Sequence, residues 1–156
     1  MTDPTRLENI EEIIDFAIKR EREAQATYLS YAGKTGRRSF SELLLSMAEM
    51  EKEHERKLVE LKQGRRGLDS FTPPEQADLG LAEMLVEVPF SEDMEYGDFL
   101  ILVIRKEQDA QRLYRKLGGM TSSAELKNMF ALLADEERKH RDWAQERYDQ
   151  DILQEN

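Results

Sequence analysis

The sequence predicts an all-α protein, a four-helix bundle made of two repeated helical hairpins joined by a long crossover. Three observations predict this fold class: four segments with helical periodicity, two short glycine-containing breaks, and an internal repeat. At 156 residues the chain has the length of one domain. We therefore expect a single domain over residues 1–156, with hairpin 1 at about 5–63, the crossover at about 64–91 and hairpin 2 at about 92–150.

Each of the four helical segments carries a stripe of mainly apolar residues at alternating spacings of four and three. The stripes cover residues 10–31, 40–61, 96–117 and 126–147. This spacing places all members of a stripe on one face of a helix, as in the seams of helical bundles. A glutamate interrupts the apolar sequence near the middle of every stripe.

Two short breaks divide these segments into hairpins. They read "GKTGRR" (33–38) and "GGMTSS" (118–123), and in each we expect glycine to end one helix. The next helix is expected to begin at a capping box, which is Ser39 with Glu42 in the first break and Ser122 with Glu125 in the second.

The longest stretch without helical periodicity lies between the hairpins. It reads "GRRGLDSFTPPEQADLG" (64–80) and is followed by "LAEMLVEV" (81–88), which we interpret as a short helix. A helix of about 27 residues is roughly 40 Å long, and about a dozen extended residues can span that distance. The segment is therefore long enough to cross the bundle from end to end.

Composition excludes several classes of function. The net charge of −10 disfavours nucleic acid and anionic membrane surfaces as partners. No apolar run is long enough to span a membrane, and the first residues lack the pattern of a signal peptide, so we expect a cytoplasmic protein. The absence of cysteine excludes thiolate metal sites and cysteine nucleophiles. Any metal ligands must be oxygen or nitrogen atoms.

The two histidines of the chain occupy the same motif, A-x-x-E-x-x-H. They end "AEMEKEH" (48–54) and "ADEERKH" (134–140), an offset of 86 residues because 140 − 54 = 86. The same offset relates a further glutamate in the first helix of each hairpin. In an antiparallel hairpin, residues equally far from the turn lie level, so the glutamates should face each other at mid-bundle. The six convergent residues are Glu21, Glu51, His54, Glu107, Glu137 and His140.

Four carboxylates buried together would repel one another and lose their hydration. Two divalent cations balance the four negative charges, and two neutral imidazoles complete the ligand shells. The sequence therefore predicts a two-metal site made of the six residues. The alternative is a metal-free bundle whose core histidines are hydrogen-bonded.

At these residues the sequence resembles the rubrerythrin-like branch of the ferritin-like superfamily. The resemblance covers about residues 8–150 and includes "AIKREREAQATY" (17–28) and both A-x-x-E-x-x-H motifs. It implies a ferritin-like, di-iron carboxylate fold whose six ligands are also the catalytic residues. The implied roles are terminal carboxylates for Glu21 and Glu107, bridging carboxylates for Glu51 and Glu137, and nitrogen ligands for His54 and His140.

The chain departs from full rubrerythrins in two respects. Without cysteine it cannot form a rubredoxin iron site, so it resembles a member lacking the rubredoxin domain. Ala110 stands where rubrerythrins have an additional glutamate, which makes the site similar to that of a simple ferroxidase. Tyr28 and Tyr114 lie seven residues beyond their glutamates, where they either hydrogen-bond the ligands or pack as core aromatics.

These observations predict a di-iron oxidoreductase that reacts with O2 or peroxide and depends on an external electron donor. Two Fe ions are the expected cofactors, with Mn or Zn possible. We also expect a homodimer or a higher homo-oligomer. The alternatives are a non-catalytic metal-binding or sensing bundle, a dimanganese catalase-like protein, and an iron-storage protein.

Overall fold

The chain folds as a four-helix bundle, as predicted. The computed structural model describes residues 9–64, 67–72 and 89–155. The long helices are α1 (Ile10–Ala32), α2 (Arg38–Gly64), α4 (Tyr96–Met120) and α5 (Ala124–Asp151), and two short 3-10 helices are η1 (Leu68–Ser70) and η2 (Leu153–Glu155). The described ranges contain no β-strand apart from one isolated bridge. The short helix predicted at 81–88 lies outside the described residues.

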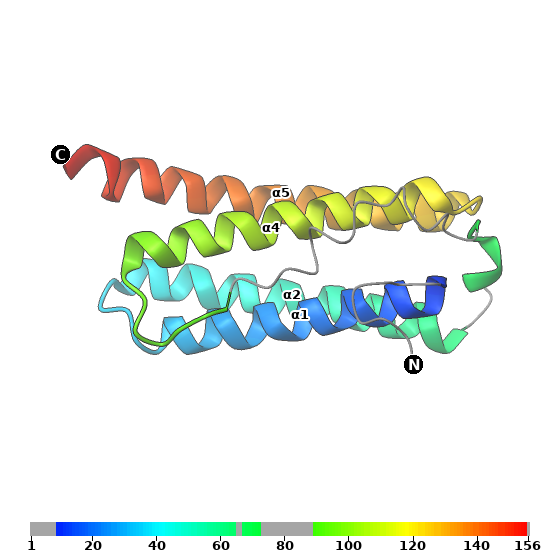
Figure 1. Cartoon of the computed structure of the whole chain (residues 1–156), viewed down its shortest axis with the longest axis horizontal. Coiled ribbons are helices and arrows are strands. Elements are labelled where there is room, and N and C mark those ends of the chain that lie inside the picture. The colour runs from blue at the N-terminus through cyan, green and yellow to red at the C-terminus, as the bar shows by residue number, and fades with distance from the viewer. Residues whose placement is uncertain (1–8, 65–66, 73–88, 156) are drawn as a thin grey trace.

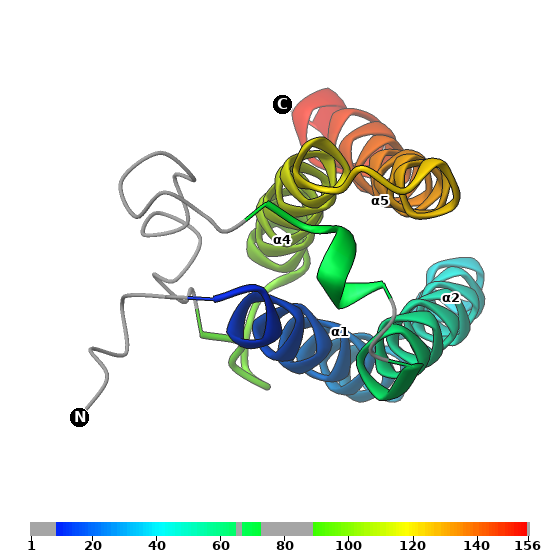
Figure 2. The ribbon, with the colours of Figure 1, turned by 90° about the vertical axis from the view of Figure 1, so that its right-hand side faces the viewer.

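The four long helices form two antiparallel hairpins that lie against each other. Figure 1 shows α1 beside α2 and α4 beside α5, all along the long axis of the molecule. In the end view of Figure 2, the helices stand at the corners of a square, with α1 next to α4 and α2 next to α5. Most close backbone contacts are made within each hairpin, and few join α1 to α4. Side chains must therefore hold the hairpins together.

The helix ends of the first hairpin match the predicted ones in part. Asn9 caps α1 by accepting a hydrogen bond of 2.9 Å from the Glu12 amide, and α1 ends before Gly33 as expected. The predicted capping box is wrong, because α2 already begins at Arg38 and Ser39 lies inside its first turn. The hydroxyl of Thr35 instead accepts a hydrogen bond from the Arg37 amide, so the chain turns before the serine is reached.

The second turn lies later in the chain than predicted. Helix α4 continues through Gly118 and Gly119 to Met120, and Ser123, not Ser122, caps α5 by accepting from the Leu126 amide. A Cβ on Gly118 would lie 3.4 Å from the Cβ of Phe130. Glycine therefore permits close packing of α5 against α4 at this point and does not end the helix.

A short backbone bridge joins the segment after the first hairpin to the turn of the second. Phe71, just after η1, pairs with Thr121 in an antiparallel bridge. The Ser122 amide donates to the Ser70 carbonyl at 2.9 Å, and the Thr72 amide donates to the Met120 carbonyl at 2.8 Å. This use of Ser122 explains why the neighbouring serine caps α5. The bridge fixes this end of the bundle.

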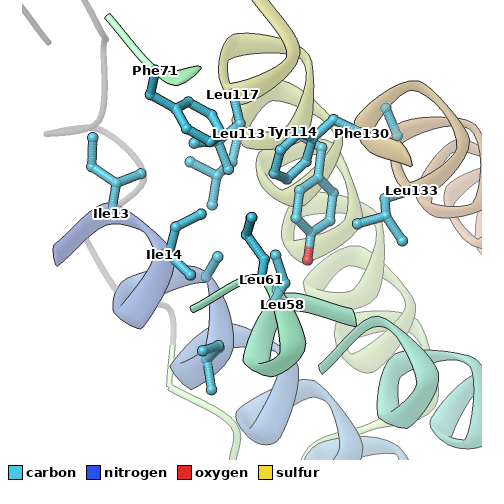
Figure 3. Close-up of a cluster of buried hydrophobic side chains, with 13 residues drawn as sticks. Ile13, Ile14, Leu58, Leu61, Phe71, Leu113, Tyr114, Leu117, Phe130 and Leu133 are labelled. Atoms are coloured by element: carbon cyan, nitrogen blue, oxygen red, sulfur yellow. The ribbon is translucent and has the colours of Figure 1, made fainter. Parts of the chain in front are cut away.

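Two apolar clusters fill the interior, one toward each end. The first gathers residues from the start of α1, the end of α2, the end of α4 and the start of α5, and the second gathers residues from the opposite parts of these helices. Figure 3 shows the first cluster, in which the Tyr114 ring lies beside Phe130. Along every long helix the buried glutamates and histidines lie between the two clusters. The apolar clusters therefore enclose a polar layer at mid-bundle.

Some large apolar side chains lie outside these clusters and are about half exposed, among them Leu29, Leu45, Ile101 and Leu132. Among the described residues, no helix combines the length and the hydropathy needed to cross a lipid bilayer.

Candidate metal centre

The structure brings all six predicted site residues together in the polar layer. Each of the four long helices contributes a glutamate, and α2 and α5 each add the histidine one turn further on. None of the six is more than 2% exposed to solvent. Leucine or isoleucine could be buried at such positions without a free-energy penalty, whereas each buried carboxylate loses its hydration. The arrangement therefore requires a compensating partner.

The six residues form two overlapping groups whose donor atoms lie within 4.8 Å of one another. Two glutamates belong to both groups, and each group adds one further glutamate and one histidine. The groups are Glu21, Glu51, His54 and Glu137 in one, and Glu51, Glu107, Glu137 and His140 in the other. Each group thus takes donors from both hairpins, so the centre exists only when the hairpins are docked.

One atom of each of the six residues is buried without a hydrogen-bond partner among the described residues. These atoms are Glu21 Oε2, Glu51 Oε1, His54 Nδ1, Glu107 Oε2, Glu137 Oε1 and His140 Nδ1. Buried polar atoms are almost always paired, and an unpaired group costs about 1–3 kcal/mol. The unpaired atoms belong to these six residues alone in the described part of the chain. The donor set therefore fits metal ions.

Both imidazoles turn Nδ1 toward the carboxylates. His54 Nδ1 lies 2.6 Å from Glu137 Oε1, and His140 Nδ1 lies 2.9 Å from Glu51 Oε1. These distances are short, yet the contacts lack the directionality of hydrogen bonds, because the same nitrogens remain without a hydrogen-bond partner. Ligand atoms gathered this closely, without hydrogen bonds between them, are an arrangement that a shared cation would stabilise.

Two tyrosines form hydrogen bonds across the hairpins to Glu107 and Glu21. The Tyr28 hydroxyl on α1 donates to Glu107 Oε1 on α4, and the Tyr114 hydroxyl on α4 donates to Glu21 Oε1 on α1. Of the two expectations for these tyrosines, the structure therefore favours hydrogen bonding to the site. Each bond occupies one carboxylate oxygen and leaves Oε2 as the unpaired atom.

The electrostatics of the centre reflect the crowding of negative charge. Burial, reinforced by the other carboxylates, raises the pKa of Glu51 and of Glu137 well above the ordinary value. Burial acts in the same direction on Glu107, but hydrogen bonding to Glu137 and the proximity of His140 outweigh it and lower the pKa of Glu107. Burial would lower the pKa of His54, yet its carboxylate contacts raise it to about 10. Glu51, Glu137 and His54 thus hold their protons more tightly than the same groups do in water.

The outer nitrogens of the two histidines meet different partners. His54 Nε2 contacts the carboxylate of Glu136 on α5, whereas His140 Nε2 lies 3.0 Å from the thioether sulfur of Met50 on α2. The hydrogen bond with His54 lowers the pKa of Glu136. Neither residue was identified from the sequence. The repeat shows only that Glu136 and Met50 are equivalent positions, because 136 − 50 = 86, and does not indicate that either contacts a histidine.

A small cavity of about 20 Å³ adjoins the carboxylates between α1 and α4. Its walls include four of the six site residues, both tyrosines, Ala24 and Ala110. The volume exceeds the roughly 10–15 Å³ needed for one water molecule. An ion pair of 3.4 Å between Arg20 and Asp109 also lines this cavity and joins the two helices. The space is therefore large enough for a water-sized molecule.

Comparisons with known proteins agree with this geometry. The family model described as Rubrerythrin matches residues 12–81 and 98–156. None of the curated proteins compared with the chain matches it.

Two solved structures share the fold. One is a candidate ferritin-like diiron-carboxylate protein from Thermotoga maritima, with a TM-score of 0.74 and 17% identity, which covers 93% of this chain and 97% of its own. The other is a hypothetical protein from Pyrococcus furiosus, with a TM-score of 0.68 and 29% identity, which covers 89% of this chain and 87% of its own. The first confirms the predicted ferritin-like fold. Because the family match spans most of the sequence and includes all six residues of the centre, the chain belongs to the rubrerythrin family.

Proposed function

We propose that the chain is a di-iron carboxylate oxidoreductase that reacts with O2 or peroxide, as ferroxidases and rubrerythrin-type peroxidases do. The observation that carries this proposal is the set of six buried, unpaired donor atoms at the middle of the bundle. Four carboxylates and two imidazoles suit iron or manganese, and zinc could bind the same donors without redox chemistry. The membership of the rubrerythrin family favours iron.

The two overlapping groups suggest a role for each residue. Glu51 and Glu137 belong to both groups, so we assign them as bridging ligands. Glu21 with His54, and Glu107 with His140, would complete the separate ligand sets. Four carboxylates balance the charge of two divalent cations, which removes the mutual repulsion of the metal-free centre.

The tyrosines would hold the terminal carboxylates in a fixed orientation. Burial, with the negative charge of the neighbouring glutamates, raises the pKa of Tyr28 and of Tyr114 well above the ordinary value. Both hydroxyls therefore stay protonated at neutral pH and act as donors. Each one engages Oε1 of a glutamate on the other hairpin and leaves Oε2 without a hydrogen bond, so that Oε2 would be available to hold a metal ion.

The small size of the cavity supports a small molecule as the substrate. Two ferrous ions bound here would together supply the two electrons that, with two protons, reduce peroxide to water. The space beside the carboxylates suits O2 or peroxide, and Ala110 widens it where a longer side chain would fill it. Continued turnover requires electrons from an external donor, because the 156 residues contain no cysteine to hold a rubredoxin-type iron. We further propose a homodimer or higher homo-oligomer, which sedimentation equilibrium tests.

The test of the proposal is anaerobic loading with ferrous iron, followed by rapid mixing with O2 or peroxide. We expect two ferrous ions per chain and their oxidation on mixing. Glu51→Ala with Glu137→Ala should abolish both. The matched control is Glu42→Ala with Glu146→Ala, which removes two exposed carboxylates from the same helices, α2 and α5. One ion or none per intact chain overturns the two-metal centre, and binding without oxidation favours the non-catalytic alternative.

A further inference from the structure

The two halves of the centre are equivalent in their donors and different in what stands behind the histidines. Each group has three glutamates and one histidine, all buried. Behind His54, the carboxylate of Glu136 contacts Nε2. Behind His140, the sulfur of Met50 lies 3.0 Å from Nε2. The pseudo-symmetry of the donors is therefore broken at one pair of equivalent positions.

A second pair of equivalent positions extends the same difference. Trp143 lies one turn beyond His140, and its ring centroid is 5.5 Å from that of the imidazole. Because 143 − 57 = 86, the equivalent residue beyond His54 is Lys57. A carboxylate thus lies behind His54, whereas a thioether and an indole lie beside His140. The outer nitrogen of one histidine meets a charged acceptor, and that of the other meets a weak one.

The contact at Nε2 determines which ring nitrogen carries the proton. A carboxylate only accepts hydrogen bonds, so Glu136 keeps the proton of a neutral His54 on Nε2. The lone pair of Nδ1 then points at the carboxylates, where a metal ion would bind. A thioether sulfur is a weak acceptor and imposes little preference on His140. A hydrogen-bonded carboxylate also increases the electron density that the imidazole offers to a metal.

We propose that Glu136 makes the two metal positions inequivalent, so that the position at His54 binds its ion first and more tightly than the position at His140. This inference rests on the proposed two-metal centre and adds an order of loading to it. Glu136 is a positioning residue, because it acts through His54 and does not itself reach the metal position. Removal of such an outer partner typically lowers metal affinity by about 10–100-fold.

The experiment is a calorimetric titration of the metal-free, full-length protein with cobalt(II), which needs no oxidant. We expect two ions per chain in two steps whose dissociation constants differ by about 10–100-fold. His54→Ala should remove the tighter step and His140→Ala the weaker one. This pair of variants assigns each step to a position independently of enzymatic activity.

Exchange of the two outer residues separates the effect of Glu136 from repulsion between the ions. Glu136→Met gives both histidines a thioether neighbour, so the two steps should converge while the total stays at two. Met50→Glu gives both a carboxylate, so the weaker step should tighten toward the stronger one. The double exchange should restore two steps with their order reversed. Glu49→Met, an equal loss of charge on an exposed residue of α2 beside Met50, should leave the separation unchanged.

Each outcome bears on a different statement. Two steps that remain equally far apart in Glu136→Met overturn the inequivalence, because the separation would then come from repulsion between the ions alone. Two equal steps in the wild-type protein overturn it as well, while the metal centre stands. Failure of the wild-type protein to bind cobalt(II), with unchanged circular dichroism, overturns the metal centre itself.

Discussion

The Tyr114 hydroxyl on α4 donates a hydrogen bond to the Glu21 carboxylate on α1, and so ties the second hairpin to the first at the centre of the bundle. Tyr28 makes the equivalent hydrogen bond to Glu107. Few close backbone contacts join α1 to α4, so these two bonds are a principal polar link between the hairpins. They also connect the stability of the bundle to the geometry of the metal centre.

Replacement of Tyr114 by phenylalanine should therefore destabilise the protein while keeping its packing. A buried hydrogen bond to a charged group contributes about 1.5–3 kcal/mol, and the free energy of unfolding should fall by that amount. Urea denaturation followed by circular dichroism measures it. The control is Tyr148→Phe, which alters a partly exposed ring of α5 and should change stability by less than about 0.5 kcal/mol. Equal losses in the two variants would contradict a role for the Glu21 contact.

Metal should stabilise the folded protein, since an ion bound only by the folded state adds free energy by mass action. At a free-metal concentration of 100 times the dissociation constant the gain is about 2.7 kcal/mol, equivalent to about 5–10 °C in Tm for a chain of this size. Differential scanning calorimetry with and without ferrous iron or cobalt(II) tests this. Coincident melting curves at saturating metal would show that the buried carboxylates do not bind a cation.

In the absence of metal, neutralising two carboxylates should raise the stability of the protein, whereas most core substitutions lower it. Glu51→Gln with Glu137→Gln removes two mutually repelling charges and keeps the side-chain size. We expect a higher Tm of the metal-free protein and loss of the stabilisation by metal. A metal-free variant that melts below the wild type would indicate that the glutamates are held by protein hydrogen bonds.

Stability of the metal-free protein should also depend on pH in a defined direction. The pKa values of Glu51 and Glu137 are raised by folding, so their favourable contribution is fullest below the unfolded value, roughly 4.3, and is lost as pH rises above it. The pKa of His54 is raised to about 10, so its contribution is present below roughly 6.5 and is lost as pH rises through about 10.

The measurement is urea denaturation of chelator-treated protein between about pH 5 and 9. The advantage of Glu51→Gln with Glu137→Gln over the wild type should widen as pH rises, because the variant has lost the two carboxyl titrations. Metal binding should tighten over the same range, since cations displace protons from the ligands. A constant difference between the two proteins across this range would refute the raised pKa values.

The oxidation reaction should stop after one cycle unless a reductant is supplied. The diferrous protein would provide two electrons to one peroxide, and no rubredoxin-type iron site can form without cysteine. Stopped-flow measurements should show one rapid oxidation, with renewed reaction only after addition of a rubredoxin-like donor. Sustained peroxide consumption by the purified protein without a donor would instead favour a dimanganese, catalase-like centre, where peroxide is both oxidant and reductant.

The sequence predicted the bundle and the meeting of six residues because both follow from periodicity. Four apolar stripes define four helices, and an offset of 86 residues places equivalent glutamates and histidines at one level. The turns were predicted less well, because glycine and serine have more than one use. Gly118 lies within α4, where it allows Phe130 of α5 to pack closely, and the Ser122 amide pairs with the Ser70 carbonyl. Such choices depend on contacts between distant segments.

The contacts behind the histidines could not be predicted for a related reason. Glu136 stands directly before a buried glutamate in a highly charged segment, where a sequence pattern indicates only solvated helix surface. Its contact with His54 joins α5 to α2 and depends on how the two hairpins dock. The direction of the tyrosine hydroxyls likewise follows from docking, since each reaches a glutamate of the other hairpin.

The difference between Glu136 and Met50 has a consequence for how such a centre can evolve. Two separate, identical hairpins related by a two-fold axis must carry the same residue at both positions, because every substitution appears on both sides of the centre. A single chain that contains both hairpins is free of this constraint. Mutation can then change the neighbour of one histidine while the other stays as it was. Fusion of the two halves thus allows one binding position to specialise without altering its twin.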